Sequence, residues 1–277
     1  MNEVTACRSV LIEVLTILGK DLDKLVVVGG WVPELLYPND GHIGSLDVDL
    51  ALDARKLKPM AYESIRQKLI DSGYRQEDRS SNRFFRPIPG TPQTVKLDLI
   101  TGEFAGLPAD ESHLTIQELS VWKAHGIDLA FEFQQDIAID GTLPGGGRNR
   151  VTAKLPTVGA FVCIKAITLA ERMKQKDAYD ICFCVDHFAG GYRALALELR
   201  TIGEHPLIRE GLEVLRDKFA RIDSIGPVWA AQTADETGAG SGPEFEGLQR
   251  RAWELVRRLL EAIGGPDSPD ATTCYPI

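Results

Sequence analysis

The sequence predicts an α+β fold, in which a small mixed β-sheet flanked by helices is followed by a C-terminal helical domain. Up to about residue 155, short β-branched runs with period-two alternation are separated by turns and amphipathic segments. From Thr157 onward the apolar residues follow the helical period of about 3.6 residues. We therefore expect a sheet-containing domain over residues 1–155, a helical domain over 156–263 and a flexible tail over 264–277.

The individual elements follow from the same patterns. Apolar residues at helical spacing over 11–18 predict a helix, and the β-branched run over 24–28 predicts a buried strand that ends at two glycines. The next elements in the chain are a short helix over 32–38, a strand over 46–52, a helix over 58–74 and strands within 81–90 and 93–102. Residues 112–156 alternate weakly and are predicted to form further short strands. Helices are predicted over 157–175, 178–188, 206–222 and 244–264.

Composition limits the class of protein. A chain of 277 residues with 44% hydrophobic and 26% charged residues can bury a sizeable core. Its formal net charge of -9 argues against non-specific coating of nucleic acid, and no DNA partner is expected. Five widely spread cysteines, an odd number, are typical of a reducing cytoplasm. We expect no signal peptide and no membrane span, because no apolar run approaches about 20 residues.

Three carboxylates interrupt apolar strands. Asp47 and Asp49 alternate with Leu46, Val48 and Leu50, so both aspartates project from one face of the strand and the apolar residues face the core. Asp98 repeats this pattern in the strand within 93–102. If the two strands are neighbours, the three carboxylates converge and can hold two Mg²⁺ ions. The alternative for an isolated D-x-D is a pair of solvated aspartates at a strand edge.

Small residues next to this strand favour the metal hypothesis. The first strand ends at Gly29 and Gly30, and Ser45 comes two residues before Asp47. Glycines let backbone N–H groups approach a triphosphate closely, and a serine hydroxyl adds another donor. These three residues are therefore candidate nucleotide-binding positions.

Lys165 stands alone in an otherwise apolar helical stretch. A buried ammonium is costly unless it is paired, so Lys165 either contacts a phosphate or extends its head to water. Arg172 lies on the same side of the helix and is a second candidate nucleotide ligand. Asp180 would lie about 22 Å from Lys165 on one straight helix, so we expect the chain to turn between them. Asp177 is then predicted to cap a second helix, with Asp180 facing the cleft.

The segments "GGWVPELLYPNDGHIGSLDVDL" and "IKAITLAERMKQKDAYDI" resemble those of the AbiEii-type nucleotidyltransferases, within the polymerase-β-like nucleotidyltransferase superfamily. That group shares a Gly-Gly turn, a D-x-D strand, a helical lysine and an Arg…Lys/Arg-Asp-x-x-Asp segment. The resemblance covers about residues 24 to 185, with a longer spacing between Gly30 and Asp47. It implies a nucleotidyltransferase-type sheet and a catalytic set made of Asp47, Asp49, Asp98, Lys165 and Asp180. For Asp180 it implies a role either as a base or in holding Lys165.

The resemblance also implies an activity. A nucleoside monophosphate would pass from an NTP to an acceptor hydroxyl with two Mg²⁺ ions, or Mn²⁺, and release of pyrophosphate. The implied acceptor is RNA, such as the 3′ end of a tRNA, and the implied role is that of a toxin with a cognate antitoxin. Basic residues over 148–176 favour RNA, whereas the overall acidity favours an antibiotic-like small molecule as the acceptor. A non-catalytic nucleotide-binding module is the third interpretation.

Two smaller interpretations stay open. His42 precedes Ser45 in a turn-rich loop, and we expect it to be exposed or in contact with substrate. Arg79, Arg83 and Arg86 lie along a predicted hairpin and are interpreted as a solvated strand face, with contact to the acceptor as the alternative. Cys182 and Cys184 point in opposite directions on a helix, which excludes a shared zinc ion and favours buried core cysteines.

Overall fold

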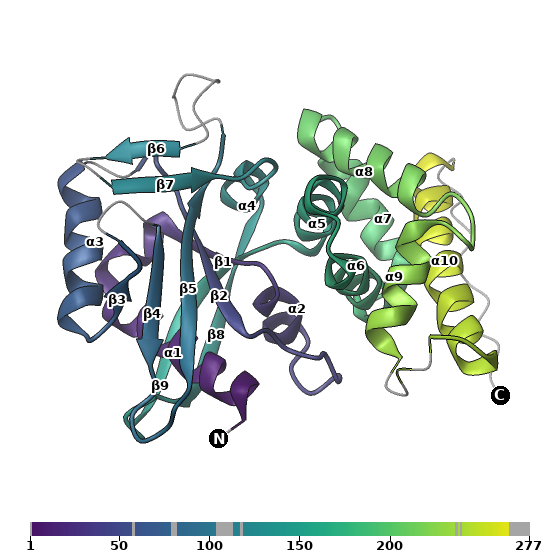
Figure 1. Cartoon of the computed structure of the whole chain (residues 1–277). Helices are drawn as coiled ribbons and strands as arrows, with labels where there is room; N and C mark the ends of the chain where they lie inside the picture. Colours follow the sequence, from purple (N-terminus) through teal and green to yellow (C-terminus); the bar gives the residue numbers. More distant parts are fainter. Residues whose placement is uncertain are drawn as a thin grey trace.

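The computed structural model describes residues 2–56, 59–78, 82–103, 113–116, 119–235, 238 and 240–265. A mixed sheet with flanking helices forms one half of the molecule, and a bundle of helices forms the other (Figure 1). The predicted α+β fold class is therefore confirmed. The last strand ends at Pro156 and the next helix begins at Val158, close to residue 157, where the apolar pattern changes to a helical period. The predicted tail covers residues 264–277, and its residues after Gly265 lie outside the described part of the chain.

The sheet places the aspartate-bearing strands next to each other. Its strands are β1 (Leu25–Val28), β2 (Asp47–Leu52), β3 (Arg75–Gln76), β4 (Arg83–Pro87), β5 (Thr94–Thr101), β6 (His113–Ile116) and β7 (Leu119–Lys123). The main order is β1-β2-β5-β4-β3, and β7 pairs with β5 and with β6. Strands β2 and β5 run parallel, whereas β1 and β4 lie antiparallel to them. A separate hairpin consists of β8 (Gln134–Thr142) and β9 (Arg148–Pro156).

The helices of the first half are α1 (Glu3–Ile17), α2 (Trp31–Leu36), α3 (Pro59–Asp71) and α4 (Asp128–Glu132), and a 3₁₀ turn covers Gly19–Lys24. Helix α1 begins where the Asn2 side chain accepts a hydrogen bond from the Thr5 N–H at 2.7 Å. Helix α4 lies in the segment predicted as strands only. It was missed because five residues are too few to display a helical period.

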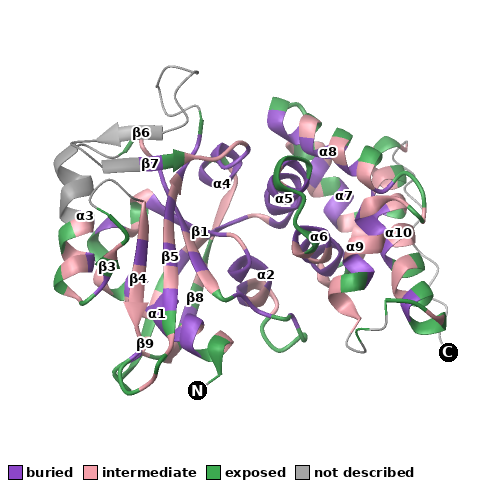
Figure 2. Ribbon diagram, in the orientation of Figure 1, coloured by how far each residue is buried: buried purple, intermediate pink, exposed green. Residues whose placement is uncertain are grey.

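The hydrophobic core is one cluster of buried residues drawn from the sheet, from α1 and from the helical half (Figure 2). Val48 and Leu50, which alternate with the aspartates in β2, are both buried, as the alternation predicts. Leu46 was predicted to face the core with them, but its side chain is 58% exposed. The strand begins only at Asp47, so the alternation does not extend back to Leu46.

The helical half contains α5 (Val158–Arg172), α6 (Gln175–His187), α7 (Gly191–Thr201), α8 (Pro206–Lys218), α9 (Ile225–Ala234) and α10 (Pro243–Gly264). Helix α5 packs against α8 and α6, and α9 packs against α6 and α10. Within the described part of the chain, every helix is too short or too polar to cross a membrane.

The chain turns between α5 and α6, as the distance between Lys165 and Asp180 requires. Met173 ends α5 in the left-handed conformation with φ of 51°, and α6 begins at Gln175. The prediction that Asp177 caps the second helix is wrong. The N-cap position is Lys174, and Asp177 lies within the first turn.

Candidate active site

The three predicted aspartates meet on one face of the sheet. Asp49 on β2 is the register partner of Asp98 on the parallel strand β5. Asp47 lies two residues before Asp49 and therefore shares its face. Period-two alternation and strand pairing thus bring the carboxylates together from two distant segments.

Two basic side chains form ion pairs with these carboxylates. The Lys96 Nζ lies 3.1 Å from an oxygen of Asp47 and 3.2 Å from an oxygen of Asp98, so one ammonium bridges both strands. Arg83 on β4 donates from Nε to Asp98 at 2.8 Å. The Arg83 side chain is 36% exposed, so it is partly solvated as predicted, and it pairs with Asp98, its register partner on β5. Arg79, which was given the same interpretation, lies outside the described residues. Lys96 was not predicted, although its position two residues before Asp98 is a usable signal.

The two aspartates of β2 have opposite electrostatic environments. Burial raises the pKa of Asp49 to about 6, and the nearby charges of Asp47 and Asp98 act in the same direction. Burial also opposes ionisation of Asp47, but hydrogen bonds from the Ser45 hydroxyl and Lys96 outweigh it and lower the pKa of Asp47. Asp49 is therefore harder to ionise than Asp47.

The Gly-Gly turn lies directly against this group. Gly29 has a φ of 72°, and a Cβ at this position would lie 2.1 Å from an Asp49 oxygen. A Cβ at Gly30 would lie 2.8 Å from the Ser45 Oγ and 3.0 Å from the Lys176 Nζ. Gly29 therefore requires glycine, because its positive φ and the Asp49 carboxylate leave no room for a side chain. At Gly30 a side chain would displace the Ser45 hydroxyl and the Lys176 ammonium. Lys176 brings a cation of the helical half to the predicted phosphate-binding turn.

Lys165 is buried in an ion-pair network. Its ammonium lies 2.7 Å from an Asp177 oxygen and 2.8 Å from an Asp180 oxygen, and the residue is only 4% exposed. These carboxylates raise its pKa despite burial. Arg172 donates twice to Asp177, from Nε and Nη2, each at 3.1 Å.

The network bears on three predictions. Lys165 does not extend its head to water, because it is buried with Asp177 and Asp180. Contact of Lys165 with a phosphate stays a prediction, and so does that of Arg172, whose side chain is 52% exposed beside Asp177. Asp180 was predicted to face the cleft, which is wrong because it is fully buried. Lys165 and Arg172 still act on the carboxylates at a distance, since their charges favour ionised Asp49.

His42 joins the loop before β2 to this network. It was predicted to be exposed or to contact substrate, but its side chain is fully buried, with Nε2 2.9 Å from an Asp180 oxygen. The Gly44 N–H donates to its Nδ1 at 3.1 Å, so Nε2 carries the proton that is donated to Asp180. Burial lowers the pKa of His42, against the effect of Asp180. Its ring packs against Tyr179 and Phe183 on α6, contacts that a loop sequence does not reveal.

The carboxylates suit a hard cation by their chemistry. They supply oxygen donors only, and burial together with the like charges of Asp47 and Asp98 raises the pKa of Asp49, so a bound cation would favour its ionised form. Among the side chains that the structure describes, no three acidic, histidine or cysteine residues already surround one common metal position. The Lys96 ammonium lies between two of the carboxylates and supplies the positive charge there.

Comparison with known proteins gives limited similarity. No protein-family model matches this chain, and no curated protein matches it. Among solved structures, JHP933 from Helicobacter pylori aligns with a TM-score of 0.43 and 11% identity, covering 93% of this chain and 94% of that chain. A candidate nucleotidyltransferase from H. pylori aligns with a TM-score of 0.45 and 11% identity, covering 93% and 96%. Both likenesses are too weak to transfer an activity to this chain.

Proposed function

We propose that this protein is a nucleotidyltransferase that moves a nucleoside monophosphate from an NTP to an acceptor hydroxyl. The observation that carries the proposal is the group of Asp47, Asp49 and Asp98 on adjacent parallel strands, next to the Gly29–Gly30 turn. Carboxylates in such a group place metal charge where negative charge develops during phosphoryl transfer. A purely structural role does not explain why like charges lie together at a turn that admits no side chain.

The residues divide into phosphate-binding and carboxylate positions. The backbone of Gly29 and Gly30, the Ser45 hydroxyl and the Lys176 ammonium line the side on which a triphosphate would bind. Asp47, Asp49 and Asp98 would hold Mg²⁺ or Mn²⁺, which would supply positive charge at the reacting phosphate. Lys96 keeps two of these carboxylates neutralised and, on its flexible stem, can move away when a cation binds.

The Lys165 network positions the phosphate side of the site. Asp180 accepts from Lys176 at 2.8 Å and from His42 at 2.9 Å while it neutralises Lys165. One buried carboxylate therefore fixes a phosphate-binding lysine and the loop that carries Ser45. We assign Lys165 and Asp180 a positioning role in place of direct contact with the nucleotide.

The acceptor has two candidates. RNA, including the 3′ end of a tRNA, is implied by the family resemblance and by the basic stretch 148–176. Several of those basic residues have internal partners, such as Arg148 with Asp140 and Lys154 with Asp136, which reduces the charge left for a polyanion. This pairing favours the second candidate, a hydroxylated small molecule. A toxin role with a cognate antitoxin rests on the resemblance alone.

Incubation with each labelled NTP and Mg²⁺ or Mn²⁺, with and without total RNA, tests the proposal. Transfer of label to RNA or to an added hydroxylated small molecule supports it and identifies the acceptor class. Asp47→Asn and Asp49→Asn should abolish transfer, whereas Asp136→Asn, on the exposed face of β8, should leave it unchanged. Nucleotide binding without transfer to any acceptor would support the non-catalytic module and reject the proposal.

A further inference from the structure

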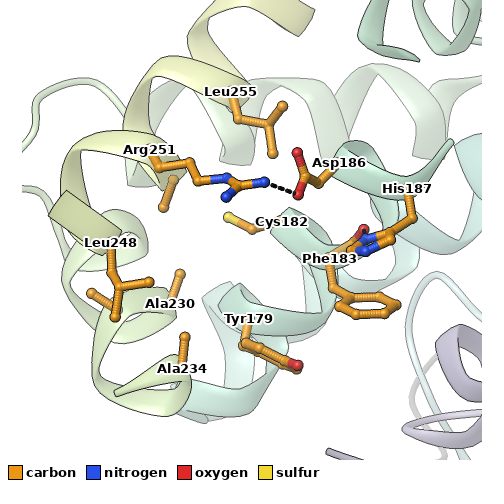
Figure 3. Close-up of a pocket in the computed structure, with 12 residues that line it drawn as sticks. Tyr179, Cys182, Phe183, Asp186, His187, Ala230, Ala234, Leu248, Arg251 and Leu255 are labelled. Carbon is orange, nitrogen blue, oxygen red and sulfur yellow. Dashed lines mark hydrogen bonds and ion pairs between the residues drawn. The ribbon is translucent and has the colours of Figure 1, made fainter. Parts of the chain in front are cut away.

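A cavity of about 320 Å³ opens in the helical half between α6, α9 and α10 (Figure 3). None of the three aspartates or the residues of the Gly-Gly turn lines it. Cavities that hold small molecules in proteins are of about this size or larger, with mainly apolar walls and a few polar groups. The cavity is therefore a candidate binding site separate from the carboxylates.

The walls of the cavity suit a flat ring. Tyr179 and Phe183, one turn apart on α6, contribute aromatic side chains (Figure 3). Ala230 and Ala234 face it from α9, where short side chains leave the space open. An aromatic ring could contact the aromatic wall and fill the space above the alanines.

The rim of the cavity carries one donor group beside one acceptor group. Arg251 on α10 donates from Nη2 to an Asp186 oxygen on α6 at 2.6 Å, as Figure 3 shows. The two side chains are 70% and 31% exposed, so water reaches both. The guanidinium has further N–H groups and the carboxylate has a second oxygen, and both can bind a ligand while the pair stays joined.

This combination suits a flat ligand whose edge carries a donor beside an acceptor. The edge of every nucleobase carries a hydrogen-bond donor next to an acceptor, and its two faces are flat and apolar. An aliphatic ligand would leave the Arg251–Asp186 pair unused, and a simple anion would lie next to the Asp186 carboxylate. We propose that the cavity is a nucleobase-binding pocket, with the base ring between the two walls and its edge on the pair. The base could belong to a free nucleoside or nucleotide, or to an unpaired position of an RNA strand.

The test measures binding of guanosine, adenosine, cytidine and uridine to the full chain by titration calorimetry. Nucleosides without phosphate, in buffer without divalent cations, avoid binding at the carboxylate site. We expect at least one nucleoside to bind, and Arg251→Gln to weaken its binding about tenfold, the loss typical of one base-edge contact. Arg250→Gln is the matched control, because Arg250 is the neighbouring exposed residue of α10 and does not line the cavity.

Two further arms complete the experiment. Ala234→Phe should fill the space and abolish binding, with circular dichroism to verify that the variant is folded. A short single-stranded RNA replaces the nucleosides in the second arm, and binding of RNA alone would identify a strand as the source of the base. The proposal is overturned if neither nucleosides nor RNA bind, or if Arg251→Gln binds them as tightly as Arg250→Gln. Because no transfer step is measured, this result is independent of the proposed nucleotidyltransferase activity.

Discussion

Asparagine at position 49 should stabilise this protein while it abolishes nucleotidyl transfer. Asp49 is the central member of three carboxylates, and burial together with two like charges raises its pKa from 3.8 to about 6. The Asp49→Asn variant keeps the shape of the side chain and removes its charge. Stability and activity are therefore expected to change in opposite directions, as at a site built for binding a cation.

The magnitude follows from proton linkage. The folded protein holds a proton on Asp49 between about pH 4 and pH 6 that the unfolded chain has lost, so stability falls as the pH rises through this window. A pKa shift of this size lowers the free energy of unfolding at high pH by at most about 3 kcal/mol. Because the Asp49 side chain is partly exposed to solvent, we expect about 2 kcal/mol. Asp49→Asn avoids this cost, so its advantage should be complete above pH 6 and vanish below pH 4.

Urea denaturation at several pH values measures the difference. Asp53→Asn is a control of opposite sign, because burial of Asp53, just after β2, is outweighed by the combined hydrogen bonds and charges of Arg55 and Lys56, which lower its pKa. That variant should lose stability at pH 8, where the Asp53 charge stabilises the fold, and approach the wild type as the pH falls. The reasoning is refuted if Asp49→Asn is no more stable than the wild type at pH 8, or if its advantage does not depend on pH.

Three other variants test the remaining contacts. Gly29→Ala should lower the free energy of unfolding by about 2 kcal/mol or more and abolish transfer, because the new Cβ would collide with the Asp49 carboxylate at a residue with φ of 72°. An unchanged melting temperature and unchanged activity would contradict this close approach. Asp180→Ala should lower the free energy of unfolding by about 3–5 kcal/mol, since it leaves the buried Lys165 ammonium short of a partner, and urea curves that overlay the wild type would exclude this role. His125→Gln should remove up to about 1 kcal/mol of stability at pH 6. Burial opposes the charge of His125, but two glutamates on either side raise its pKa, so the loss should fade as the pH rises through that raised pKa; a difference independent of pH would contradict the assignment.

Local patterns allowed much of the sheet half to be predicted. Alternation placed Asp47 and Asp49 on one face of β2 and Asp98 on β5, because side chains along a strand alternate whatever the rest of the chain does. The Gly-Gly turn and Ser45 were identified as part of the site for a similar local reason. Lys96 could have been found by the same alternation.

The partners of the buried charges could not be predicted from the sequence. Lys165 in an apolar helix required an anion or a route to water, and the sequence left a phosphate, water and the Asp180 carboxylate as alternatives. The chain reversal at Met173 decides the question, because it brings Asp177 and Asp180 to within 2.7 Å and 2.8 Å of the ammonium. His42 depends on the same packing, since its burial comes from rings on α6 that lie far along the chain.

The sequence by itself thus determined the α+β class, the strand faces and the presence of a carboxylate group beside a glycine turn. Only the tertiary structure decided that Lys165, Asp177 and Asp180 form a buried network and that His42 belongs to it. The physical reason lies in the range of the interactions. Alternation and turn conformation are set by neighbouring residues, whereas the neutralisation of a buried charge depends on which distant segment packs against it.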